Sequence, residues 1–80
     1  MAKQRVKFTF PNDLVTEPVI YRLSTEYKII TNIRRADVQE DVGWVVLELE
    51  GTQSDIDTGL TWVAELGVRV DLISGDVIEG

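Results

Sequence analysis

The chain has 80 residues, no cysteine, no histidine and a formal net charge of −6 at pH 7. A chain of this length forms one domain, and the two missing residue types exclude disulfides, thiolate metal sites and iron–sulfur clusters. They also remove the commonest general base and the commonest metal ligand. The negative charge disfavours nucleic acid as a partner, because affinity for nucleic acid comes mainly from neutralising phosphates.

The same inventory limits location and chemistry. No apolar run approaches the length of a membrane span and the N-terminus lacks a secretory signal, so we expect a cytoplasmic protein with no membrane span. No nucleophile–base pair can be assembled, and the carboxylates Asp55 and Asp57 suit a helix start better than acid–base work. We therefore expect no catalytic residue, no metal, no cofactor and no enzymatic activity. The acidic surface is either solvated or a docking face for a basic partner.

Residues 5–10 alternate between apolar and polar side chains, which predicts a half-buried strand. Turn residues from Pro11 to Asp13 end it. Thr16 and Pro18 then indicate a helix start, with a capping side chain and a proline in the first turn. An apolar stripe at helical spacing follows: Val19, Ile20, Leu23 and Tyr27.

Residues 29–38 and 44–50 predict two further strands, joined by a short connection that contains Gly43 and therefore forms an antiparallel hairpin. In the second of these strands the apolar face alternates with a mixed face. The apolar face is Val45, Leu47 and Leu49, and the other face is Trp44, Val46, Glu48 and Glu50.

Thr52 and Asp55 have the spacing of a capping box, which predicts a second helix, and Gly67 predicts its end. Trp62 falls on the outer side of this helix, where it either packs beneath a terminus or marks a second contact surface. Residues 68–72 alternate as a fourth strand, and residues 74–80 are expected to be a flexible tail. The domain then spans residues 1–80, with a core from about 4 to 73.

This order of elements predicts an α+β, ferredoxin-like βαββαβ fold, with sheet order 4-1-3-2 and both helices on one face. The other sheet face has no helix to cover it. On that open face, Arg5 and Lys7 of the first strand lie between acidic residues of the third and fourth strands, Glu48, Glu50 and Asp71. They either form cross-strand charge pairs or offer an anion site.

An apolar patch on the open face and the unpaired edge of the second strand predict a homodimer. We expect this interface to include Ile30, Arg34, Trp44 and Val46. Asn32 lies in the same strand although asparagine is depleted in strand interiors, so it either caps a local turn or is held by something it binds.

Several short runs occur in a characteristic order: Phe8-x-Phe10, Glu17-Pro18-Val19-Ile20, Asn32-Ile33, Leu47-Glu48-Leu49-Glu50-Gly51, Leu60-x-Trp62-Val63 and Gly67-Val68-x-Val70. Together they resemble the NIL domain, an ACT-related module at the C-terminus of methionine-import ABC transporter ATPases. The resemblance covers about residues 4–73, with no nucleotide-binding domain present, so we expect a free-standing copy.

The resemblance implies a module that dimerises and binds methionine. The family's Asn-Ile-Leu run supplies a ligand-binding asparagine, and this role is carried over to Asn32, with Ile33 beside it. The third position of the run is Arg34 instead of leucine, and the following hairpin is shorter than usual. Both departures lie close to the inferred site.

These observations lead to two functional hypotheses. The first is a dimeric regulatory module that binds an amino acid or a sulfur metabolite such as methionine. In it Asn32 and Ile33 bind the ligand, helped by Asn12 and Asp13 of the first strand–helix loop, while the helix N-terminus suits a ligand carboxylate. The second is an assembly module that binds an unidentified protein and no metabolite, through Trp44, Val46 and Trp62.

Overall fold

The computed structural model describes residues 1–11, 18–39 and 43–73, and contains six elements that confirm the predicted order. The four strands form one antiparallel sheet in the order β2-β3-β1-β4, which is the predicted 4-1-3-2 read in reverse. The elements are β1 (Ala2–Phe10), α1 (Val19–Glu26), β2 (Ile30–Val38), β3 (Gly43–Gly51), α2 (Gln53–Glu65) and β4 (Arg69–Ile73).

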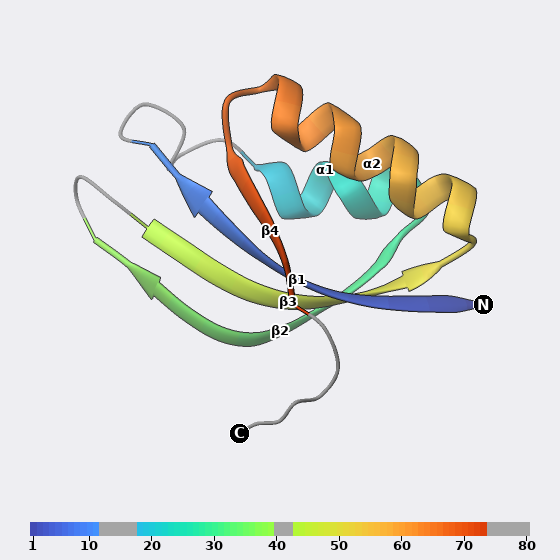
Figure 1. Cartoon of the computed structure of the whole chain (residues 1–80), viewed down its shortest axis with the longest axis horizontal. Helices are drawn as coiled ribbons and strands as arrows, with labels where there is room; N and C mark the ends of the chain where they lie inside the picture. Colours follow the sequence, from blue (N-terminus) through green and yellow to red (C-terminus); the bar gives the residue numbers. More distant parts are fainter. Residues whose placement is uncertain (12–17, 40–42, 74–80) are drawn as a thin grey trace.

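The molecule has two layers, because both helices lie on the same face of the sheet (Figure 1). Alternation along β3 and from Val6 to Phe10 of β1 buries every second residue under the helices and leaves the others half-buried on the open face. The core contains side chains from the helices and the strands: Val6, Phe8, Phe10, Val19, Leu23, Ile29, Val45, Leu47, Leu49, Ile56, Val63 and Val68.

The ends of α2 follow the sequence prediction. The Asp55 N–H donates a hydrogen bond to the Thr52 hydroxyl at 3.1 Å, which is the expected capping interaction. Gly67 has φ 101°, a backbone conformation that glycine adopts without steric cost. On the sheet-facing side of α2, Ile56 and Val63 are buried, whereas Ala64 is exposed.

The helix α1 ends less regularly. Its last turn leads into Lys28, which has φ 59°, and the Ile29 N–H then donates to the Leu23 carbonyl at 3.3 Å. A left-handed residue turns the chain from α1 back toward the sheet, so β2 begins at Ile30 with Ile29 buried. Thr16, the predicted cap of α1, lies outside the described residues.

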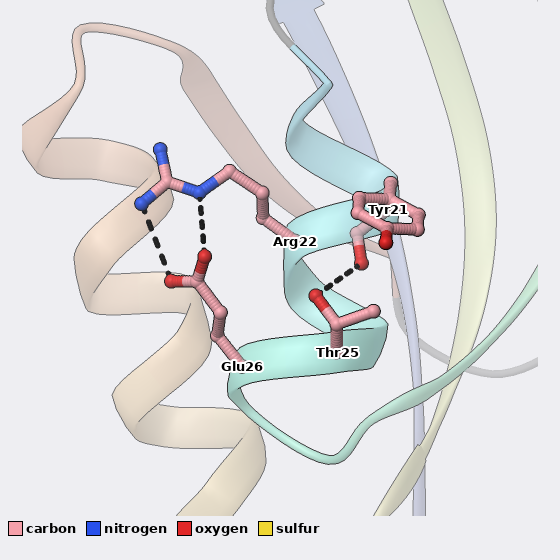
Figure 2. A network of polar contacts seen from close by, with 4 residues as sticks. All are labelled: Tyr21, Arg22, Thr25 and Glu26. Carbon is pink, nitrogen blue, oxygen red and sulfur yellow. Dashed lines mark hydrogen bonds and ion pairs between the residues drawn. The ribbon is translucent and has the colours of Figure 1, made fainter.

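Trp62 packs between the two helices, which differs from its predicted place on the outer side of α2. Its ring stacks on Tyr27 with centroids 5.3 Å apart, and the Arg22 guanidinium lies 4.7 Å from its centroid. Figure 2 shows Arg22 and Glu26 extending together from one side of α1, joined by an ion pair of 3.0 Å, while Tyr21 lies on another side. Trp62 is therefore half-buried in the helix layer.

Candidate functional site

An apolar groove of about 260 Å³ lies where the start of α1 meets β2. Side chains from four elements line it, among them Phe10, Val19, Tyr21, Ile33, Val38 and Val45. Phe10 at the end of β1 and Pro18 just before α1 both contribute to the lining. Asn12 and Asp13, which are predicted to bind a ligand, lie outside the described part of the chain.

The groove is apolar and is also accessible to solvent. Phe10, Val19 and Val45 are buried and form its floor, whereas Tyr21, Ile33 and Val38 remain 67 %, 55 % and 64 % exposed. Small-molecule sites are typically concave, mostly apolar and equipped with a few polar groups. Residues of the first turn of α1 line the groove, and this turn follows Pro18, an N-cap residue that makes no side-chain cap hydrogen bond.

The two ligand-binding candidates on β2, Asn32 and Ile33, lie on opposite faces of the sheet. Ile33 pairs with buried Leu47 and so belongs to the helix side, where it lines the groove. Asn32 pairs with Glu48 and belongs to the open face. One strand thus presents a groove residue to one side and an amide to the other, and the structure does not bring the two candidates together.

A β-bulge interrupts β2 between Ile33 and Arg35. Beyond it, Arg35 pairs with Val46 and its guanidinium lies 5.9 Å from the Trp44 ring centroid. The sequence assigned this position to Arg34, but the bulge adds one residue and moves Arg35 to the place beside Trp44. Arg34 itself is the residue without a partner in the β2–β3 register.

The open face carries opposite charges on neighbouring strands, as predicted. Arg5 and Glu48 form an ion pair of 3.4 Å between β1 and β3. Of the two alternatives for Arg5, the structure therefore shows the cross-strand charge pair and not an anion site. Lys7 lies opposite Asp71 in the register, but its ammonium is 5.0 Å from the Trp44 centroid, and Asp71 pairs with Arg69 at 3.1 Å. Trp44 and Val46 are half-buried on this face, and Ile30 is 58 % exposed.

The described residues contain no cluster of three or more potential metal ligands. The longer described helix, α2, has 13 residues, and neither helix is long and apolar enough to cross a bilayer. Sequence reasoning missed Tyr21 and Val38 as groove residues. Both are apolar or aromatic residues on elements whose buried faces had already been assigned. Which residues they contact depends on where α1 crosses β2, and the sequence does not show this.

Comparison with known proteins gives a family and a fold. The family model of the NIL domain matches residues 4–72. The chain is 27 % identical over 75 residues to the methionine import ATP-binding protein MetN 1 of Enterococcus faecalis. The match covers 89 % of this chain but only 21 % of that protein, so the chain spans about a fifth of its curated relative.

Solved structures agree on the fold. The crystal structure of the C-terminal domain of an ABC transporter ATP-binding protein from Enterococcus faecalis superposes with a TM-score of 0.79 at 19 % identity. That likeness covers 91 % of this chain and 86 % of the other. The de novo designed protein Ferredog-Diesel gives 0.57 at 14 % identity, covering 91 % and 85 %. At these identities the structures support the ferredoxin-like fold alone.

Proposed function

The chain belongs to the NIL domain family, and we propose that it is a regulatory module that binds an amino acid or a sulfur metabolite such as methionine. It acts as a dimer in the cytoplasm and has no catalytic activity of its own. The carrying observation is the apolar groove between α1 and β2, which is lined by Ile33 of the family's Asn-Ile motif. The name of its relative, a methionine import protein, supports the choice of ligand class.

The chemistry of the groove suits such a ligand. Phe10, Val19 and Val45 give an unbranched apolar or thioether side chain a dispersion contact, and the groove volume of about 260 Å³ is ample for it. The ligand carboxylate lies toward the first turn of α1, whose N–H groups and dipole favour an anion. Asn12 and Asp13 complete the site by binding the ligand ammonium group.

Binding is transmitted through β2, since this strand faces both the groove and the open side of the sheet. A ligand against Ile33 holds β2 against α1 and so fixes the positions of Asn32 and Arg35 on the other face. If the dimer uses that face, ligand and dimer are coupled. Such coupling requires that the ligand binds one arrangement of the dimer more tightly than the other.

A thermal-shift screen against amino acids and sulfur metabolites, with methionine included, tests the proposal. A ligand at about 100 times its dissociation constant stabilises by roughly 2.7 kcal/mol, or several degrees in a domain of this size. Ile33→Lys should remove the shift, because it puts a charge into the groove. Leu72→Lys is the matched control: Leu72 is similarly exposed but lies on β4, at the opposite edge of the sheet from β2.

Asn32→Ala locates the ligand relative to the sheet. If the ligand occupies the groove, this variant should retain most of the shift, because its side chain lies on the opposite face. Loss of the shift in Asn32→Ala together with its retention in Ile33→Lys would place the ligand on the open face and overturn the groove assignment. The absence of a thermal shift with every ligand at millimolar concentration would contradict the sensor proposal.

The second candidate, an assembly module without a metabolite, is favoured by the exposed apolar residues along β2. This edge strand presents Ile30, Ile33 and Val38 with more than half of each side chain exposed. A flat ligand screen combined with capture of a specific partner, lost on Trp44→Ala or Val46→Glu, would favour it over the sensor.

A further inference from the structure

The apolar groove is lined by β2 and by the first turn of α1, so it lies beside an open edge of the sheet. β2 pairs with β3 on one side and with no other strand of the described chain on its outer side (Figure 1). In such an edge strand, every second residue directs its N–H and C=O groups away from the neighbouring strand. An unpaired backbone edge next to an apolar groove is typical of sites that bind an extended peptide as an added strand.

The groove follows β2 over several residues. Ile33, Ala36 and Val38 all line it, although strict alternation would put residues 33 and 36 on opposite faces. The bulge between Ile33 and Arg35 takes up the extra residue, and all three lining residues then pair with helix-side positions of β3. They span roughly 15 Å of strand at about 3.3 Å per residue, which exceeds one free amino acid and matches an extended segment of about four residues.

The half of the groove beyond the bulge has the spacing of a strand. Ala36 and Val38 lie two residues apart on the same face, which is the spacing of successive same-face side chains in a strand that pairs with them. Ala36 is exposed and small, and it lies between the larger side chains of Ile33 and Val38, so it leaves space in the lining. This half of the groove therefore suits two apolar side chains from one added strand.

The bulge also limits the length of strand that can be added. It divides the edge into residues 30–33 and residues 35–38, and exposed Arg34 lies at the break. Bulges and charged side chains on an edge strand interrupt further pairing. Pairing across the bulge is therefore disfavoured, whereas a short segment alongside residues 35–38 keeps a regular register.

The open-face side chains of residues 35–38 give this edge a charge pattern. Arg35 and Asp37 are both exposed, and among the described residues neither has an ion-pair partner. The Arg35 guanidinium lies 5.9 Å from the Trp44 ring centroid, and Asp37 accepts hydrogen bonds of 3.4 and 3.5 Å from the Gln39 amide. Opposite charges on facing strands are favourable, so this edge is complementary to an acidic residue opposite Arg35 and a basic residue opposite Asp37.

We propose that residues 35–38 bind a short extended segment of a partner protein as an added antiparallel strand. From its N-terminus, the segment places an apolar residue opposite Val38 and a basic residue opposite Asp37. An apolar residue opposite Ala36 and an acidic residue opposite Arg35 follow. The two apolar side chains enter the groove, and the two charged ones lie on the open face.

This inference rests on the groove of the proposed function but not on a free metabolite. A flat metabolite screen leaves the peptide site standing, whereas a methionine shift without peptide binding leaves the sensor standing. The two failures are therefore distinguishable. If both ligands bind, saturating methionine should weaken peptide binding, because the two compete for the groove.

Fluorescence anisotropy with two synthetic peptides of equal composition tests the register. The probe is a labelled, end-capped peptide Ser-Leu-Lys-Met-Glu-Ser, and the control peptide exchanges its lysine and glutamate. The wild type should bind the probe about tenfold more tightly, because the exchange puts like charges opposite each other. The double variant Arg35→Glu/Asp37→Lys, which keeps the net charge, should reverse this preference. Equal binding of both peptides, or no binding at millimolar protein, overturns the proposal.

Backbone N-methylation of the probe tests strand addition without changing the protein. The N–H groups of its leucine and methionine point to one edge of the added strand, and those of its lysine and glutamate point to the other. Methylation on the edge that faces β2 should weaken binding at least about tenfold, and methylation on the outer edge should change it by less than about twofold. Equal effects would mean that the peptide occupies the groove without pairing with β2, which overturns the proposal. So does self-association that Val38→Lys abolishes in a protein that binds no peptide, since the edge would then belong to a second copy.

Discussion

The strands β1 and β2 have the same length and opposite environments. Both have nine residues, yet β1 buries Val6, Phe8 and Phe10, while β2 leaves eight of its nine side chains exposed. Position in the sheet causes the difference, because β1 pairs with β3 on one side and β4 on the other, whereas β2 forms an edge. The central strand builds the core, and the edge strand is available for binding.

Regularity differs as well. The register of β1 with β3 runs without interruption over nine residue pairs, so a simple alternation describes both of its faces. The register of β2 shifts at the bulge after Ile33. A strand with a bulge changes which face its later residues present, and this places the candidate ligand and interface residues where the sequence pattern is least informative.

The largest expected effect is a difference in stability loss between substitutions in β1 and in β2 on the helix side of the sheet. Phe8→Ala removes a fully buried ring and should lower the free energy of unfolding by about 3–5 kcal/mol. Ile33→Ala, on the same face but 55 % exposed, should change it by no more than about 0.5 kcal/mol. Urea denaturation measures both, and similar losses would contradict the view that β2 contributes little to the core.

A smaller effect is expected where β2 joins the core. A Cβ atom at Gly59 would lie 2.6 Å from Ile29 Cδ1 and 3.0 Å from Leu23 Cδ2. Gly59→Ala should therefore destabilise by about 1–2 kcal/mol, even though alanine is the better helix former by up to about 1 kcal/mol. The exposed neighbour Thr58→Ala is the control for helix propensity and should not destabilise; a stabilising Gly59→Ala would mean that Ile29 moves aside freely.

The same comparison explains what the sequence could predict. Alternation on β1 and β3 identified their buried faces correctly, and the Thr52–Asp55 cap and Gly67 marked the ends of α2. These features are local, since each depends on residues within a few positions of one another, and the ferredoxin-like fold followed from their order.

The site depended on features that are not local. Nothing in the run from Ile30 to Val38 indicates a bulge, so Arg34 was placed where Arg35 lies. Asn32 was grouped with Ile33 through the family resemblance, although neighbouring residues of a strand face opposite sides of the sheet. The groove also requires the N-terminal turn of α1 to lie against β2, and no single segment encodes that approach. Trp62 was misplaced for a related reason, because its environment is set by Tyr27 of another element.

A substitution at the start of β2 should stabilise the protein slightly. Lys28 has φ 59°, a conformation that costs a residue with a Cβ about 1 kcal/mol, so Lys28→Gly should raise the free energy of unfolding by about 0.5–1 kcal/mol. Lys28→Ala loses the same charge but keeps the strain, and should give no such gain. Equal effects of the two variants in thermal unfolding would assign any change to charge instead of backbone conformation.

The smallest effect concerns the open face. A double-mutant cycle on Arg5→Ala and Glu48→Ala should give a coupling of about 0.2–1 kcal/mol, because the pair is about one-third exposed and water screens it. The coupling should fall as salt is added. Measuring the cycle at a protein concentration where the chain is monomeric isolates the contact within one sheet. If the coupling free energy is larger at concentrations where the chain is dimeric, the same two side chains also contact the second copy. The open face would then differ from the core, because its charged residues stabilise contacts both within the sheet and between copies.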